Sequence, residues 1–152
     1  MRPIALTSLL TAAAAAVGSL GTTPDSDWYR SLDRPPWQPP GIAFPLVWTP
    51  LYALIGWGTG RAIEHAPEGE RTRLWALTGA DLAVNAAWCW AFFDRESPRA
   101  GLATIVVLNG LNVALVREAA RHDRTAAVAL TPYAAWTGFA TLLNASIWRR
   151  NR

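Results

Sequence analysis

Residues 37–52 read Trp37-Gln38-Pro39-Pro40-Gly41-Ile42-Ala43-Phe44-Pro45-Leu46-Val47-Trp48-Thr49-Pro50-Leu51-Tyr52, a proline-stiffened loop that runs directly into an apolar segment. The two adjacent prolines fix their own backbone angles and favour extended conformations in the residues before them. No charged residue follows before Arg61, and this distance is long enough to begin a membrane span. Trp48 and Tyr52 are four residues apart, so a helix places both rings on one face. The stretch therefore predicts a rigid loop leading into an aromatic-lined helix.

The composition is that of a membrane protein with short connections. Of the 152 residues, 51% are hydrophobic and 16% are charged, below the roughly 25% charged residues usual in soluble domains. All basic residues are arginine, and the net charge of +3 falls in short clusters between long uncharged runs. This pattern is typical of loops at a membrane surface and does not indicate a nucleic-acid partner. The single cysteine, Cys89, excludes an intrachain disulfide and a cysteine metal cluster.

Five apolar runs, each close to the roughly 20 residues that cross a bilayer as a helix, account for most of the chain. They cover residues 4–23, 43–61, 74–93, 100–117 and 125–148. The polar faces at helical spacing that a water-soluble bundle would show are largely missing. The sequence therefore predicts an all-α membrane protein, a bundle of five transmembrane helices forming a single domain over residues 1–152. Residues 24–42 form the one longer loop.

The first run leaves an alternative open. It follows a basic start and is rich in alanine, so a signal peptide would look similar. A run of 20 residues is somewhat long for a signal peptide, which favours a retained helix. Ala14 and Gly18 in this run, and Gly56 and Gly60 in the second, have the small-xxx-small spacing that permits close packing of membrane helices.

Three of the predicted helices bring aromatic rings and amides to one half of the bilayer. The second run leaves the membrane surface that carries the 24–42 loop, and the third and fifth runs arrive there. This connectivity places at similar depth Trp48, Tyr52, Asn85, Trp88, Phe92, Leu143 and Asn144, with Trp136 nearer the midplane. We therefore predict an apolar pocket beneath the loop, which would act as its lid.

Other polar and aromatic residues have structural interpretations. Tryptophans near the ends of runs fit the aromatic belts at membrane interfaces. These are Trp28, Trp75 and Trp148. Asn109 and Asn112 lie one turn apart, and we interpret them as hydrogen-bonding between helices. Asp81, an ionisable residue within a span, is expected to face the interior, although the sequence shows no partner for it.

No catalytic or metal site is expected in this pocket. His65 and His122 are the only histidines, and both lie in connections on the opposite side, so an axial histidine for a heme is not expected. The sequence contains no catalytic triad, no convincing pair of carboxylates and no phosphate-binding loop. Cationic side chains on the loop side that could meet ligand carboxylates are Arg30, Arg34, Arg95 and Arg99.

A set of motifs runs in order from residue 37 to residue 148. They are Trp37-x-Pro39-Pro40, Val47-Trp48-x-x-Leu51-Tyr52, Asn85-x-x-Trp88-x-x-x-Phe92-Phe93 and Pro132-Tyr133-x-x-Trp136-x-x-Phe139-Ala140-x-x-Leu143-Asn144. In these motifs the chain resembles the tryptophan-rich sensory protein / translocator protein family (TspO/MBR), also called peripheral-type benzodiazepine receptors. The resemblance implies a five-helix, multi-pass integral membrane protein, commonly a homodimer. Arginine in place of lysine and abundant alanine favour a bacterial source, hence the cell envelope.

The resemblance also implies ligands for the pocket. Tetrapyrroles come first, with protoporphyrin IX as the expected ligand and heme as a further candidate, followed by sterols and isoquinoline- or benzodiazepine-type compounds. No cofactor is required. By position, the residues that match the family's pocket are Trp48, Asn85, Trp88, Trp136, Ala140 and Leu143, with Trp37 in the lid. Together with Tyr52 and Phe92, these are our ligand-binding candidates.

The chain departs from the family at two places. Asp81 stands where relatives often carry glutamine. The end of the fifth run, residues 143–149, lacks the central tyrosine of the family's sterol-recognition pattern, which makes sterol the weakest of the implied ligands.

We therefore expect a membrane receptor or sensor that binds a tetrapyrrole and acts in porphyrin-linked stress regulation. Two alternatives stay open. One is light- and oxygen-dependent breakdown of protoporphyrin, with Trp48 and Trp136 as the redox-active rings. The other is transport of a tetrapyrrole or sterol, although five spans without an inverted repeat argue against a conventional alternating-access carrier.

Overall fold

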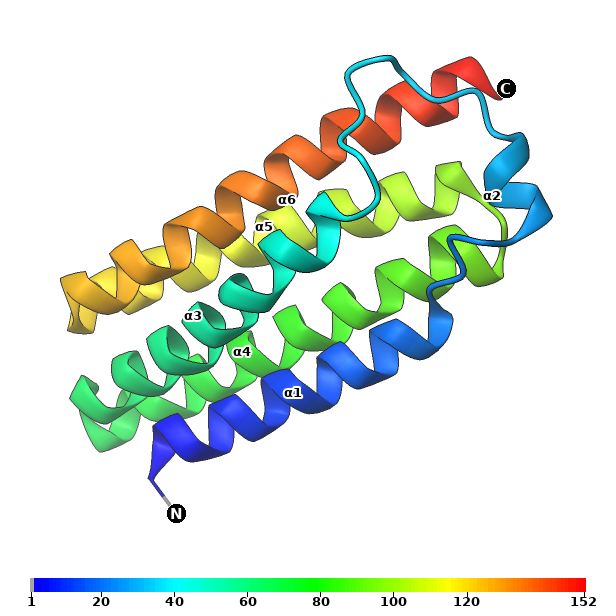
Figure 1. Cartoon of the computed structure of the whole chain (residues 1–152). Helices are drawn as coiled ribbons and strands as arrows, with labels where there is room; N and C mark the ends of the chain where they lie inside the picture. The colour runs from blue at the N-terminus through cyan, green and yellow to red at the C-terminus, as the bar shows by residue number, and fades with distance from the viewer. Residues whose placement is uncertain (1) are drawn as a thin grey trace.

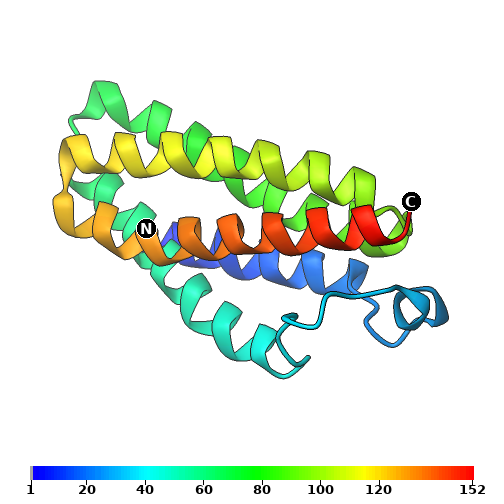
Figure 2. The ribbon, with the colours of Figure 1, turned by 90° about the horizontal axis from the view of Figure 1, so that it is seen from above.

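A computed structural model describes residues 2–152, and all regular secondary structure in these residues is helical, with no strand (Figure 1). The elements are α1 (Pro3–Gly21), α2 (Asp27–Ser31), α3 (Ala43–His65), α4 (Glu68–Cys89), the π-helical turn η1 (Trp90–Asp94), α5 (Pro98–His122) and α6 (Arg124–Arg150). The five long helices run side by side, and α2 lies in the loop at one end of them (Figures 1 and 2). The all-α prediction is confirmed.

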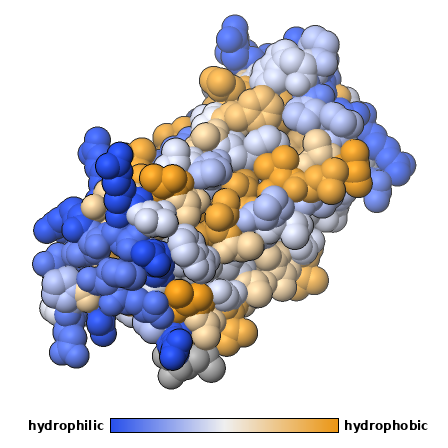
Figure 3. Space-filling view, turned by 60° about the vertical axis from the view of Figure 1, so that its left-hand side comes forward, coloured by the Kyte–Doolittle hydropathy of each residue, from blue (hydrophilic) through white to orange (hydrophobic). Residues whose placement is uncertain are grey.

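Three helices, α1, α5 and α6, are long and apolar enough to cross a membrane. α3 is less hydrophobic than these three because it is rich in tryptophan, glycine, threonine and proline. α4 is less hydrophobic because its first two turns carry several charges and its middle carries Asp81 and Asn85. Hydrophobic residues gather along the middle of the face seen in Figure 3, and hydrophilic residues gather at its two ends. This distribution is the one expected for an integral membrane protein.

α5 and α6 begin one or two residues before the predicted runs 100–117 and 125–148, because a polar cap precedes each of them. Ser97 caps α5, and its Oγ accepts a hydrogen bond from the backbone N–H of Ala100 at 3.1 Å. Proline then occupies the first helical position of α5. Asp123 caps α6 in the same way through the N–H of Ala126, at 2.7 Å.

α1 packs closely against α3, as the glycine spacing predicts. A Cβ on Gly60 would overlap the backbone of Ile4, and a Cβ on Gly56 would lie 2.9 Å from the Cα of Ser8. The Thr7 hydroxyl donates a buried hydrogen bond of 2.6 Å to the carbonyl of Gly56. These contacts make α1 part of the bundle.

We expect Gly60→Ala to lower the thermal stability of the detergent-solubilised protein, because the added methyl group collides with the Ile4 backbone. Overpacking of this kind costs about 1–3 kcal/mol. The matched control is Gly110→Ala, since no atom lies within 4 Å of the added Cβ there. Thermal melts followed by circular dichroism should show a loss of several degrees for Gly60→Ala alone. Identical melts of both variants and wild type would contradict the close approach.

Ion pairs join the helix ends that lie away from α2. The Asp123 carboxylate binds Arg61 twice, with Nε 3.1 Å from Oδ1 and an Nη atom 2.9 Å from Oδ2. Glu118 is buried and lies 3.3 Å from Arg73 and 3.4 Å from Arg121. The hydrogen bond from Arg61 holds the pKa of Asp123 below its usual value of 3.8. This end of the bundle is therefore tied together by polar contacts across three helices.

The lowered pKa of Asp123 predicts how stability depends on pH. The carboxylate contributes stability above its unfolded pKa of 3.8, and this contribution is lost as the pH falls through the lower folded value. We expect Asp123→Asn to keep the helix cap but to lose the ion pair, whereas Asp123→Ala loses both, the cap alone being worth about 1 kcal/mol. Melting temperatures should be measured from pH 7 to pH 3. At pH 7 wild type should melt highest, Asp123→Asn lower and Asp123→Ala lowest. The gap between wild type and Asn should close in acid. A gap that stayed constant would contradict this role of the carboxylate.

Candidate ligand-binding pocket

A cavity of about 1020 Å³ lies inside the bundle, at the end that carries α2 and the 24–42 loop. This volume is at the upper end of the range usual for small-molecule sites. The structure brings eight of the nine candidate residues to its wall. They are Trp48, Tyr52, Asn85, Trp88, Phe92, Trp136, Ala140 and Leu143. They come from α3, α4, η1 and α6, so the structure brings together the three segments that the sequence placed around the pocket.

Trp37 lies outside this cavity, in contrast to the prediction. Trp37 lies within a turn of the loop, which is closed by a hydrogen bond of 3.0 Å from the N–H of Gln38 to the carbonyl of Pro35. The Trp37 ring therefore points away from the pocket and packs edge-on against Phe139, with ring centroids 5.9 Å apart. The loop still covers the cavity, but through other residues. These are Arg34, Pro35, Gln38, Pro39, Pro40 and Gly41.

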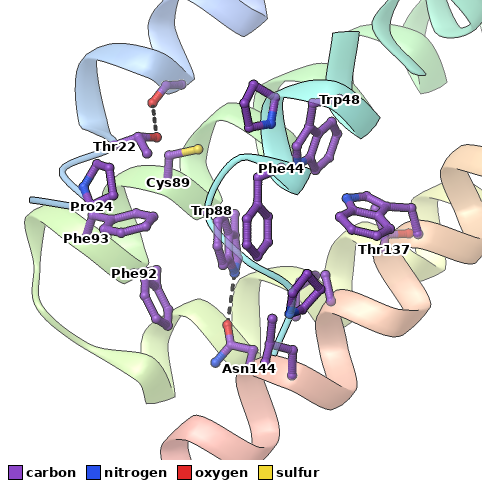
Figure 4. Close-up of a pocket in the computed structure, with 18 of the residues that line it drawn as sticks. Thr22, Pro24, Phe44, Trp48, Trp88, Cys89, Phe92, Phe93, Thr137 and Asn144 are labelled. Atoms are coloured by element: carbon purple, nitrogen blue, oxygen red, sulfur yellow. Dashed lines mark hydrogen bonds between the residues drawn. The ribbon is translucent and has the colours of Figure 1, made fainter. Parts of the chain in front are cut away.

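The cavity wall presents flat aromatic faces from several directions. Trp48 stacks on Tyr52 with ring centroids 5.2 Å apart, and Trp88 stacks on Phe92 at the same distance. Phe44 and Trp48 enter from α3 and face the Trp88 side of the cavity (Figure 4). Such faces suit a planar aromatic guest, because offset and edge-on contacts between rings are favourable over a range of positions.

Several residues of the cavity wall were not predicted from the sequence. Phe44 precedes Trp48 by four residues, and this spacing was a usable signal that both rings share one face. Ile105 and Leu108 come from α5, which was not expected to contribute. The π-helical turn η1 adds a residue to the last turn of the third segment, and both Phe92 and Phe93 are buried there.

A buried polar chain lies behind the aromatic wall. The Tyr133 hydroxyl donates to Asp81 Oδ1 at 2.8 Å and accepts from Asn85 Nδ2 at 2.8 Å. A hydroxyl that gives its single hydrogen to a carboxylate can only accept from the amide, so the Asn85 NH₂ group must face Tyr133. Within residues 2–152 no group donates to the Asn85 amide oxygen, and Asn85 lines the cavity. The Asn85 amide oxygen is thus a hydrogen-bond acceptor ready for a ligand, and the buried Oε1 of Gln38 on the same cavity wall also has no partner among these residues.

Three further asparagines join helices. Asn144 accepts from the Trp88 indole N–H at 3.0 Å, and its own NH₂ group donates to the carbonyl of Pro98 at 2.7 Å. Asn109 and Asn112 donate to threonine hydroxyls of α6 at 2.6 and 2.9 Å. The interhelical role predicted for the last two is confirmed.

Of the four candidate arginines, only Arg34 lines the cavity. Its guanidinium lies over the Tyr29 ring, 5.1 Å from the centroid, and the Tyr29 hydroxyl accepts from the Gln38 side chain at 3.1 Å. Arg30 instead lies 3.7 Å from Asp25. The mouth of the cavity therefore offers one arginine for an anionic group of a ligand.

Fold and site together define a helical integral membrane protein with an aromatic pocket covered by a loop. Comparison with known proteins agrees: the profile of the TspO/MBR family matches residues 6–149. The chain belongs to the TspO/MBR family.

Curated relatives cover nearly the same length. The tryptophan-rich protein TspO of Chlorobaculum tepidum is 34% identical over 141 residues, which is 90% of this chain and 89% of that protein. The tryptophan-rich sensory protein of Cereibacter sphaeroides is 34% identical over 142 residues, 90% of this chain and 87% of that protein. The human translocator protein is 32% identical over 127 residues, 82% of this chain and 75% of that protein.

Proposed function

We propose that this protein is a membrane receptor that binds a tetrapyrrole, with protoporphyrin IX as the ligand, and signals the porphyrin status of the cell. The observation that carries the proposal is the cavity of about 1020 Å³ walled by stacked aromatic faces. A flat macrocycle can stack on such walls without a fixed hydrogen-bond register. The words "sensory" and "translocator" in the names of the relatives are compatible with a ligand-binding role.

In this proposal α3 and α4 cross the membrane together with α1, α5 and α6, and the protein assembles as a homodimer. α3 has 23 residues and α4 has 22, which at 1.5 Å per residue suffices for a hydrocarbon core of about 30 Å. The polar residues Asp81 and Asn85 of α4 are buried inside the bundle, away from lipid.

Two polar groups would orient the macrocycle. The free amide oxygen of Asn85 accepts a hydrogen bond from a pyrrole N–H, and Arg34 pairs with a propionate at the cavity mouth. A metallated porphyrin has no pyrrole N–H, and the residues that line the cavity include no histidine to serve as an axial ligand. We therefore propose that the site prefers free-base protoporphyrin IX over heme.

Titration of protoporphyrin IX into the detergent-solubilised protein, followed by quenching of tryptophan fluorescence, tests the proposal. We expect saturable quenching, weakened roughly tenfold by Arg34→Gln, because a charge-assisted hydrogen bond is worth about 1.5–3 kcal/mol. Arg99→Gln is the matched control, since Arg99 does not line the cavity. Equal losses in the two variants, or none in either, would contradict the role of Arg34.

Light- and oxygen-dependent breakdown of the bound porphyrin is the second candidate. It is favoured by the presence of Trp48 and Trp136, two oxidisable rings, on the wall of the same cavity. Illumination of the complex in air should then bleach the porphyrin absorbance, and Trp48→Phe with Trp136→Phe should abolish the bleaching. If bound porphyrin bleached no faster than free porphyrin, the protein would bind porphyrin without accelerating its breakdown.

A further inference from the structure

A second groove, of about 800 Å³, runs along the outside of α6 beside the loop. Its walls share no residue with the ligand pocket. The residues that line it are Trp37, Phe139, Leu142, Ala145, Ser146, Arg149, Arg150 and Arg152. The lining is therefore apolar along the body of the helix and strongly basic at its end.

The loop side of the groove is held in place by polar contacts. Asn151 accepts from the backbone N–H of Asp33 and donates to its carbonyl, both at 2.9 Å. Arg150 lies 3.5 Å from the Asp33 carboxylate. The loop consequently crosses the C-terminal end of α6 at a fixed place (Figure 1), and Trp37 closes the groove by its contact with Phe139. The groove is preformed.

The groove has the layout of one lipid molecule. Leu142 is 67% exposed on α6, a helix apolar enough to span the membrane, so this part of the groove lies at acyl-chain depth. Arg149 and Arg152 follow on the same face of the chain at the helix end, where a phosphate group of the leaflet is found. Asp33 neutralises Arg150 alone, which leaves two arginines for an anionic headgroup.

We propose that this groove binds an anionic glycerophospholipid of the surrounding leaflet, such as phosphatidylglycerol. The phosphodiester lies between Arg149 and Arg152, and one acyl chain lies along Leu142 and Phe139. A sterol fits this chemistry poorly, because it carries no anion for the two arginines. The headgroup of a zwitterionic lipid fits less well, because its cation would stand beside them. The lipid also braces the outer side of the loop whose inner side covers the porphyrin pocket.

Native mass spectrometry of the protein with added phosphatidylglycerol or phosphatidylcholine tests the proposal. We expect one tightly retained phosphatidylglycerol per chain and weaker retention of phosphatidylcholine. Arg149→Gln with Arg152→Gln should weaken phosphatidylglycerol binding about 30-fold, at the usual contribution of each arginine near an anionic surface. The control is Arg117→Gln with Arg124→Gln, which removes two exposed arginines at the other end of the bundle.

A second variant keeps the charges and fills the groove. Ala145→Trp should displace the lipid while the protein keeps its wild-type melt, which separates blocking from unfolding. Equal retention of the two lipids, or equal losses in the two arginine pairs, would overturn the proposal. Displacement of the lipid by millimolar inorganic phosphate would also overturn it, because the site would then be a bare anion site. A dimer in which neither copy retains lipid would likewise overturn the proposal, because the groove would then be the contact between copies.

Discussion

Ala140→Trp should lower the affinity for protoporphyrin IX by about tenfold to 100-fold. Ala140 lies on the wall of the pocket, and an indole there occupies the space between the aromatic faces. A macrocycle excluded from these faces loses apolar burial worth about 1.5–3 kcal/mol per aromatic contact. Tryptophan-quenching titrations measure the effect directly.

The matched control for this variant is Leu142→Trp. Leu142 lies on the same helix but is 67% exposed on the outside of the bundle, so it adds an indole without entering the pocket. We expect this control to bind protoporphyrin as wild type does. If Ala140→Trp bound protoporphyrin as tightly as the control, the pocket would not be the porphyrin site.

Tyr133→Phe should be the most destabilising conservative change in the pocket region. It removes one hydroxyl that serves both the Asp81 carboxylate and the Asn85 amide, each at 2.8 Å. A buried polar group left without a partner costs about 1–3 kcal/mol. We therefore expect the free energy of unfolding in detergent, measured by denaturant titration, to fall by roughly 2–4 kcal/mol. Protoporphyrin affinity should fall as well, because the Asn85 amide is no longer oriented.

A double variant separates the two effects. In Tyr133→Phe with Asp81→Val no carboxylate is left unpaired, so much of the lost stability should return. The protoporphyrin affinity should stay low, since Asn85 still lacks its anchor. Tyr52→Phe is the control for the loss of a tyrosine hydroxyl, because the Tyr52 ring lines the same cavity. Recovery of both stability and affinity in the double variant would show that Asn85 does not depend on Tyr133.

The positions of the helices could be predicted because they depend on local sequence. Lengths of apolar runs decide which segments are helical, and caps such as Ser97 lie next to the residues they serve. Connectivity then decides which ends of the helices meet, and this was enough to group Trp48, Asn85 and Trp136. The rotation of each helix about its axis could not be predicted in this way, because it is set by packing between segments far apart in the sequence.

The partner of Asp81 illustrates that limit. Tyr133 lies 52 residues away on α6, and nothing local to Asp81 indicates it. Trp37 illustrates another limit. Its position depends on the turn that joins Pro35 and Gln38, and a proline-rich loop is compatible with more than one turn direction. The π-helical turn at η1 likewise has no signal in the apolar pattern.

An experimental structure of the protein with bound protoporphyrin IX tests the central claim most directly. We predict the macrocycle inside the cavity of α3, α4 and α6, in ring contact with Trp48, Trp88 and Trp136, and with a propionate at Arg34. A macrocycle on the outer surface, against Trp37 and the arginines at the end of α6, would contradict this account.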